Sequence, residues 1–273
     1  MSKITEYPEV SELIAENVFL IDGPNGTQTI KGENLPYAVV NLAPAELHRT
    51  FFRGKNLGTS FTEAQKANIQ NGSFKDLWVG DYWQSGSIKY RIADIDYWYN
   101  TGDTAFSQHH LVIVPDTNMY VHVMNDENVT TGGYTGSKMY TEGLEQAKTT
   151  IAEFFGEAVL SHREYLTNAV SNGAPSGGAW FDSTVDLMNE IMVYGTGVYT
   201  PRGNGSSIPN LYTNSKQQLA LFALCPKLLN NRSWFWLRDV VSSACFAYVS
   251  SHGDAGYGTA SNSAGVRPAF AVG

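Results

Sequence analysis

The chain is poor in charge. Only 16% of its 273 residues are charged, and 26 acidic against 18 basic side chains give a net charge of −8. So few basic groups argue against a nucleic-acid binder, because affinity for phosphates comes mostly from Lys and Arg. No apolar run approaches the roughly 18 to 20 residues that span a bilayer, and the N-terminal residues lack the apolar core of a signal peptide. We therefore expect no nucleic-acid partner, no membrane insertion, and synthesis in a reducing cytoplasm.

Cysteine is scarce as well. Cys225 and Cys245 are too few for a disulfide framework or a four-thiolate zinc site. The adjacent His109 and His110 would point to opposite faces of a strand, so they would not chelate one ion together. Residues 126–128 (Asp-Glu-Asn) are the nearest candidate for calcium, yet no further ligand string surrounds them. We expect neither a metal nor a cofactor.

Recognisable catalytic motifs are also missing. The chain has no Gly-x-Ser-x-Gly elbow, and the glycine-rich residues 132–138 have the wrong order and spacing for a phosphate loop. Residues 253–258 reverse the dinucleotide glycine spacing, so they fail too. His162-Arg163-Glu164 could place a general base, but a solvated or salt-bridged helix start is the stronger interpretation. The sequence thus predicts a protein that is not an enzyme.

Aromatic residues (12%) and hydrophobic residues (42%) are plentiful enough to bury a sizeable core. Strand and helix patterns are mixed without strict alternation, which indicates an α+β fold. Residues 17–22 and 27–31 read as a hairpin within a small N-terminal module, residues 1–45, that attaches the protein or mediates oligomerisation. The alternative is an edge hairpin of the main domain. Residues 46–75 are expected to be a helical connector, and residues 76–273 the main domain.

Several elements can be placed by their residues. Thr62 and Gln65 have the form of a capping box at a helix start. Strands are expected at residues 78–83, 88–95 and 111–114. A helix is expected from a Thr141 cap to Gly156, with Leu144, Ala147, Ile151 and Phe155 on its inner face. Two more helices are expected, one after Asp182-Ser183 with Val185, Met188, Ile191 and Met192 facing inward, and one from about residue 215 to 224.

The C-terminal stretch is the unusual one. Residues 241–273 hold six Ser, seven Ala and five Gly, interrupted by large or polar side chains. Small residues allow tight turns, and binding residues concentrate on loops that a rigid body supports.

Particular runs carry a resemblance to a known family. They are Phe235–Ala244 (FWLRDVVSSA), Phe246–Val249 (FAYV), Ala260-Ser261 and Gly265–Phe270 (GVRPAF). They resemble the variable region of phage proteins diversified by diversity-generating retroelements, which carry a C-type-lectin-like domain of the formylglycine-generating-enzyme branch. The body of the chain is similar to that family in gut Firmicutes phages, at Trp78–Trp83, Arg91–Asp94, His109–Pro115, Gly136–Tyr140 and His162–Leu166. The opening, Ile4–Val10 with Val18–Gly23, is similar to phage structural proteins.

The resemblance implies a fixed scaffold that presents rewritten positions within about residues 231–270. The implied framework is Trp236, Leu237, Arg238, Asp239, Phe246, Val249, Gly265, Val266, Arg267 and Pro268. The implied ligand-facing set is Ser233, Trp234, Phe235, Cys245, Ser250, Ser251, His252, Asp254, Gly256, Tyr257, Gly258, Thr259, Asn262 and Ala264. We expect these side chains to share one exposed face, and Arg267 to be a buried, hydrogen-bonded tether.

On this basis we expect a homotrimeric receptor-binding protein on the virion surface. Its ligand would be a host-surface protein or glycan, and the N-terminal module would contact other virion proteins. One alternative is a structural head or tail decoration protein. The other is an enzyme of the formylglycine-generating type, which is disfavoured because the two cysteines lie on different expected elements.

Overall fold

The computed structural model describes residues 18–23, 26–31, 45–200 and 217–273. The chain divides into two compact units, Met1–Pro44 and Ala45–Gly273. In the first unit, strands β1 (Val18–Gly23) and β2 (Gly26–Lys31) pair antiparallel. The hairpin predicted from the alternation in this segment is confirmed.

Residues 46–75 are built into the larger unit instead of forming a separate connector. A 3-10 turn, η3 (Ala45–Leu47), begins the segment, and helix α2 spans Glu63–Gln70. Arg53 pairs with Asp81 at 2.5 Å, and Asn56 forms a bridge with Tyr82. Ile69 of α2 is completely buried in the main core. The segment is therefore one wall of this unit.

Helix α2 begins with the capping box that the sequence predicts. The Thr62 hydroxyl accepts the Gln65 N–H at 3.2 Å, and the Gln65 side chain accepts the Thr62 N–H at 3.0 Å. We expect Thr62→Ala to lower the free energy of unfolding by about 1 kcal/mol, because one N-terminal N–H loses its partner. Urea titration would measure this change. Thr62→Ser keeps the acceptor and should stay close to the wild type; equal losses in both variants would contradict the capping role.

A six-stranded antiparallel sheet forms the body of the larger unit. Its order is β10-β15-β5-β4-β3, with β7 also paired to β15. Phe155 of helix α3 packs on the Tyr90 and Phe270 rings at 5.3 and 5.5 Å, so α3 covers one face. The elements span Tyr82–Ser85 (β3), Ile88–Ile95 (β4), Leu111–Pro115 (β5), Glu145–Phe155 (α3), Val159–Leu160 (β7), Val185–Leu187 (β10) and Pro268–Val272 (β15).

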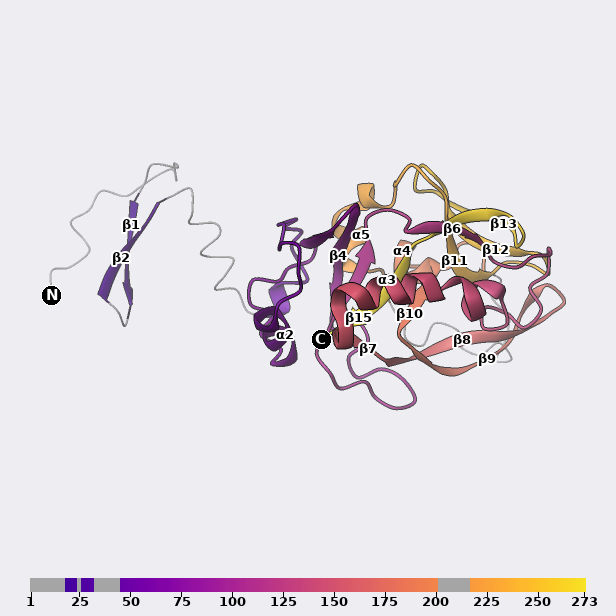
Figure 1. The fold of residues 1–273 in the computed structure, drawn as a ribbon, viewed down its shortest axis with the longest axis horizontal. Coiled ribbons are helices and arrows are strands. Elements are labelled where there is room, and N and C mark those ends of the chain that lie inside the picture. Colours follow the sequence, from indigo (N-terminus) through magenta and orange to yellow (C-terminus); the bar gives the residue numbers. More distant parts are fainter. Residues whose placement is uncertain (1–17, 24–25, 32–44, 201–216) are drawn as a thin grey trace. The chain divides into compact units, whose positions relative to one another are not determined.

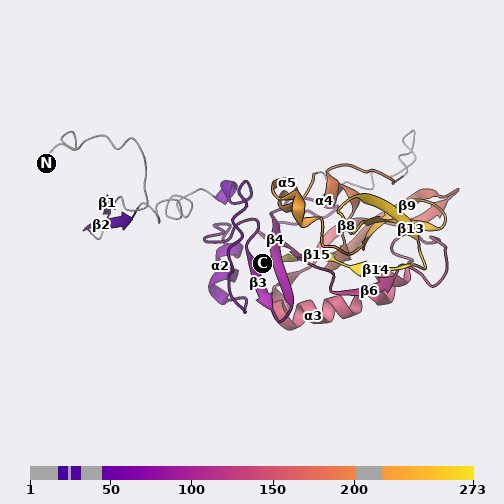
Figure 2. The same ribbon diagram turned by 90° about the horizontal axis from the view of Figure 1, so that it is seen from above.

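A second, five-stranded sheet has the order β13-β12-β11-β14-β6, and only its β11–β14 pairing is parallel. A long hairpin, β8–β9, lies beside it. The strands span Tyr120–Val123 (β6), His162–Ser171 (β8), Ala174–Ser183 (β9), Phe235–Val240 (β11), Cys245–Val249 (β12), Ala255–Thr259 (β13) and Ser263–Val266 (β14). Within residues 45–273, Figures 1 and 2 place this sheet at the end remote from α2.

Strands and a few short helices mix in this way without βαβ alternation, so the fold is α+β. In the part of the chain that the structure describes, no helix is long and apolar enough to cross a membrane.

Two strand and helix predictions near the core were misplaced. The strand expected at residues 78–83 begins only at Tyr82, because the Asp81 carboxylate accepts the Trp78 N–H at 2.9 Å and closes a turn. The helix expected from Thr141 begins at Glu145, after a π-helical turn, η4 (Met139–Gly143). The Thr141 hydroxyl donates to the Ser137 carbonyl and caps nothing. The predicted inner face of α3 is buried, and its end at Gly156 is confirmed.

Three further predictions need correction. The helix expected after Ser183 is preceded by strand β10, and α4 (Glu190–Tyr194) starts only after Asn189, whose side chain accepts the Met192 N–H. Helix α5 is short, Ala220–Leu224, and the expected start near residue 215 lies outside the described residues. His162 begins strand β8 and not a helix. The remaining short turns are η5 (Gly156–Ala158) and η6 (Pro226–Leu228).

Candidate ligand-binding site

The five-stranded sheet supports the segment that the sequence singles out. All ten positions expected to be framework are buried, from Trp236 in β11 to Pro268 at the start of β15. Arg267 is completely buried, and its Nε donates to the Pro115 carbonyl at 2.7 Å. Its guanidinium lies between the Phe222 and Phe235 rings at 5.5 and 5.0 Å, and burial lowers its pKa to about 10. The predicted tether is confirmed.

One face of this sheet carries a stacked aromatic pair. The Trp234 and Tyr248 rings lie 4.6 Å apart at 15°, and Trp234 is 48% exposed. Tyr248 covers Gly256 and Gly258 on the neighbouring strand β13, where a Cβ at Gly256 would lie 2.6 Å from the ring. These two glycines therefore leave space for the tyrosine ring.

The opposite face carries a second aromatic pair. Tyr257 of β13 is 51% exposed and meets Tyr199 edge to face at 5.1 Å. The segment that holds Tyr199 is fixed by the completely buried Glu190, whose carboxylate accepts the N–H groups of Val198, Tyr199 and Thr200 at 2.7 to 3.1 Å. A buried carboxylate thus positions an exposed aromatic surface.

The β12–β13 turn projects polar side chains beyond the sheet. Gly253 has a φ of 92°, which glycine adopts without strain, and its N–H donates to the Ser250 carbonyl. His252 and Asp254 are exposed. The Tyr194 hydroxyl of α4 donates to the Gly253 carbonyl at 3.0 Å, so the turn is held from outside the C-terminal segment.

Two of the expected ligand-facing residues are buried. Phe235 is completely buried against Arg267, and Ala264 is only 5% exposed. Both are therefore wrong as contact residues: Phe235 points to the opposite side from its neighbour Trp234, as successive strand residues do. Cys245 is partly exposed. The other expected residues are partly or fully exposed: Ser233, Trp234, Ser250, Ser251, His252, Asp254, Gly256, Tyr257, Gly258, Thr259 and Asn262.

The exposed members do not share one face, which corrects that expectation. Tyr248, the stacking partner of Trp234, pairs with Gly256 and with Trp236, so these residues lie on one side of the sheet. Gly258, two residues after Gly256, lies on the same side. The pairs Ala247↔Tyr257 and Cys245↔Thr259 belong to the other side, because neighbouring pairs alternate. The candidate site therefore surrounds the edge strand β13 and has an aromatic pair on each side.

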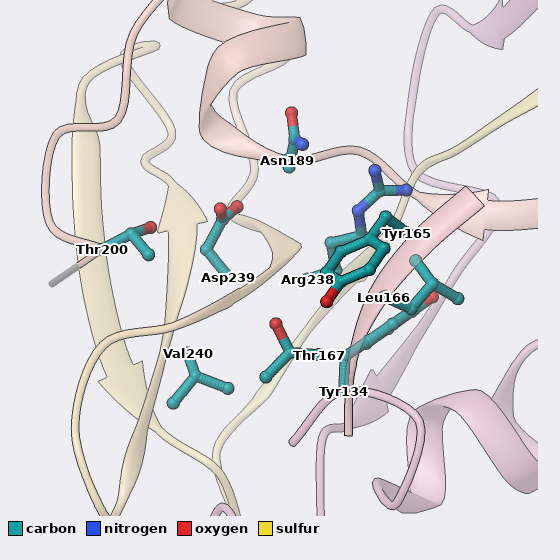
Figure 3. Close-up of a pocket in the computed structure, with 9 residues that line it drawn as sticks. All are labelled: Tyr134, Tyr165, Leu166, Thr167, Asn189, Thr200, Arg238, Asp239 and Val240. Carbon is teal, nitrogen blue, oxygen red and sulfur yellow. The ribbon is translucent and has the colours of Figure 1, made fainter. Parts of the chain in front are cut away.

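A polar cavity lies beneath this sheet, and Figure 3 shows its lining residues from β8, β11 and the segment after α4. Its volume is about 20 Å³, room for about one water molecule. Asp239 accepts the Glu190 N–H at 2.8 Å, and burial beside Glu190 raises the pKa of Asp239 to about 7. Arg238 pairs with the buried Glu164 at 3.0 Å. The cavity is too small for a ligand, so this network supports the sheet.

Tyr248, Tyr199 and Glu190 were missed by sequence reasoning. Gly256 and Gly258 are two residues apart, so they lie on the same face of a strand. Two glycines on one face could have indicated that a large side chain from the neighbouring strand covers them. Tyr199 and Glu190 lie far from the C-terminal segment in sequence, and no local pattern connects them to it.

Within residues 45–200 and 217–273, no group of three His, Cys, Asp or Glu side chains could hold an ion. Cys225 is buried, as expected, and both cysteines are free thiols. His109 Nδ1 lies 2.7 Å from Asp96, an ion-pair geometry that fixes the loop.

Comparisons with known proteins do not identify this arrangement. No family model matches the chain, and neither the curated proteins nor the solved structures give a match.

Proposed function

We propose that the protein is a receptor-binding protein of a phage virion, and that the surface around β13 contacts the host ligand. One observation carries the proposal: the aromatic pairs Trp234–Tyr248 and Tyr199–Tyr257 lie on the two sides of the edge strand β13. Trp234, Tyr199 and Tyr257 are 48%, 41% and 51% exposed. Monomeric proteins seldom expose large aromatic side chains in groups without a binding role.

The chemistry of this surface resembles that of a paratope. Trp and Tyr supply rigid contact area at low entropic cost, and Ser and Asn supply adaptable hydrogen bonds. Ser233 precedes Trp234, while Ser251 and Asn262 lie in the turns at the two ends of β13, and all three are partly or fully exposed. Within the larger unit, the sheet lies at the end remote from α2.

The finer identity that we propose is a C-type-lectin-like domain of the type diversified by retroelements. The burial of all ten framework positions supports this identity. A position that is rewritten often must lie outside the packed core, where a change of side-chain volume would destabilise the fold. In this proposal the protein is not an enzyme, the first unit attaches it to other virion proteins, and a homotrimer gains avidity from repeated sites.

A decoration protein remains a second candidate because of another surface. Leu47, Phe51 and Phe52 expose 41%, 58% and 38% of their area at the start of the larger unit. Exposed apolar residues that lie close together in the sequence are typical of surfaces that contact other subunits. A protein that only stabilises the particle would need this surface and not the aromatic pairs around β13.

The test is binding of the purified protein to intact cells of candidate gut bacterial hosts. Replacing Trp234 and Tyr257 together with Ala should weaken binding at least tenfold, since such aromatic residues dominate interface energies. Phe51→Ala is the matched control, because it removes an equally exposed ring elsewhere, and it should bind as the wild type does. Loss only in Phe51→Ala would move the receptor site to the start of the larger unit, whereas no binding to any host by the folded wild type would favour decoration. Circular dichroism would verify folding.

A further inference from the structure

Strand β13 is an edge strand, and half of its backbone groups face away from the sheet. Among the strands that the structure describes, it pairs with β12 alone. The Ser250 N–H donates to the Asp254 carbonyl at 2.8 Å, and the Ala260 N–H donates to the Ala244 carbonyl at 2.9 Å. Hydrogen-bonded pairs alternate in an antiparallel ladder, so Gly256 and Gly258 bond to β12. The N–H and C=O groups of the three residues in alternation with them, Ala255, Tyr257 and Thr259, therefore point outward.

Nearly all of these outward groups are unpaired. Among the described residues, only the Thr259 carbonyl has a partner, the Asn262 N–H at 3.0 Å. The strand Ala-Gly-Tyr-Gly-Thr contains no Pro or Lys, and its pairing with β12 runs without a bulge. Natural proteins normally protect a free sheet edge by one of those means. Within residues 45–200 and 217–273, this edge has none of these protections.

The two aromatic pairs lie on either side of this edge. Tyr248, stacked on Trp234, covers Gly256 and Gly258 on one face, and Tyr257 with Tyr199 lies on the other. An extended chain added to β13 would direct its side chains alternately to the two faces. Each aromatic pair would then receive side chains from the added strand.

We propose that the ligand supplies an extended polypeptide segment that pairs with β13 as an additional strand. This inference rests on the proposed receptor-binding function and specifies the ligand as protein. A glycan has no alternating N–H and C=O groups to match the edge, whereas a peptide strand does.

Strand addition also explains how a site with so many small side chains binds. Main-chain hydrogen bonds supply affinity whatever side chains stand at Ala255, Gly256 and Gly258. The exposed side chains around the edge then select among target segments. Replacing them would change specificity and leave the pairing intact.

The first test compares Ala255→Pro with Ala255→Val in binding to intact host cells. Proline removes the outward N–H, and it is tolerated at the first residue of an edge strand. We expect at least tenfold weaker binding for Ala255→Pro and less than a twofold change for Ala255→Val, with equal thermal stability. Unchanged binding by a folded Ala255→Pro variant would overturn strand addition and leave receptor binding standing.

A second test needs no host. A synthetic heptapeptide of alternating Thr and Val, added at millimolar concentration, should shift the amide NMR signals of Ala255, Tyr257 and Thr259. No shift at these amides overturns the proposal. A peptide response in a protein that binds no cells would support the open edge and count against receptor binding. Concentration-dependent dimers that the peptide dissociates would assign the edge to a second copy of the chain, which also overturns it.

Discussion

Replacing Arg238 with methionine is expected to lower the free energy of unfolding by about 3–5 kcal/mol. Arg238 donates to the Glu164 carboxylate at 3.0 Å, and the side chains are only 7% and 1% exposed. Removing one partner of a buried ion pair leaves the other charge uncompensated in a medium that solvates it poorly. Glu164 would keep the Trp98 indole N–H, which donates at 2.9 Å, as its remaining strong donor.

Arg163→Met is the matched control for this prediction. Arg163 is paired with Asp103 and Asp182, at 2.8 and 2.9 Å, but these pairs lie at the surface. Exposed pairs contribute little to stability because solvent screens them, so the control should unfold near the wild type in guanidinium titrations. The double variant Arg238→Met with Glu164→Gln should recover part of the loss, because neither charge is then left alone. Similar losses for the two arginine variants would contradict the assigned role of burial.

The elements that the sequence predicted correctly are those fixed by local chemistry. The Thr62–Gln65 capping box needs only residues three apart, and the β1–β2 hairpin needs only alternation around a turn. The inner face of α3 follows from the helical period. In each case the deciding interactions lie within one turn or one strand pair.

The errors arise where distant residues decide the structure. His162 begins a strand because residues 162–171 pair with residues 174–183, and β10 is a strand because it pairs with β15 at the far end of the chain. Tertiary pairing overrides local propensity in both. Of the two alternatives expected for residues 162–164, solvated or salt-bridged, Arg163 shows the ion pair, but on a strand and not at a helix start.

The candidate site shows the same division. The exposure of His252, Asp254 and Tyr257 agrees with what the resemblance implied, yet the resemblance placed both Trp234 and Phe235 in the ligand-facing set and did not separate them. Phe235 pairs with Val249 and with Gly265, and these pairings decide which face of the sheet each side chain takes. Phe235 is therefore buried and the preceding Trp234 is exposed. Tyr199 lies at the site because the Glu190 carboxylate accepts a hydrogen bond from its backbone N–H. No pattern in the sequence predicts this contact.

The stability of the fold should depend on pH through Asp239. Its folded-state pKa is raised from 3.8 to about 7, first by burial and then by the neighbouring Glu190 carboxylate, so the folded protein retains a proton that the unfolded chain has lost. Between pH 4 and 7 the folded state therefore binds more protons, and stability contributed by this group falls as the pH rises. The fall ends near pH 7. A difference of about three pH units corresponds to about 4 kcal/mol.

Asp239→Asn isolates this contribution, since the amide is always neutral and its oxygen can still accept the Glu190 N–H. The variant and the wild type should unfold alike near pH 4, while at pH 8 the variant should be more stable by up to about 4 kcal/mol. Other titrating groups, such as Glu164 and Asp186, act on both proteins and cancel in the difference. Parallel stability curves from pH 4 to 8 would show that Asp239 is already ionised in the fold. A diverging pair would instead show that a protonated carboxyl beside Glu190 supports the segment that carries Tyr199 into the site.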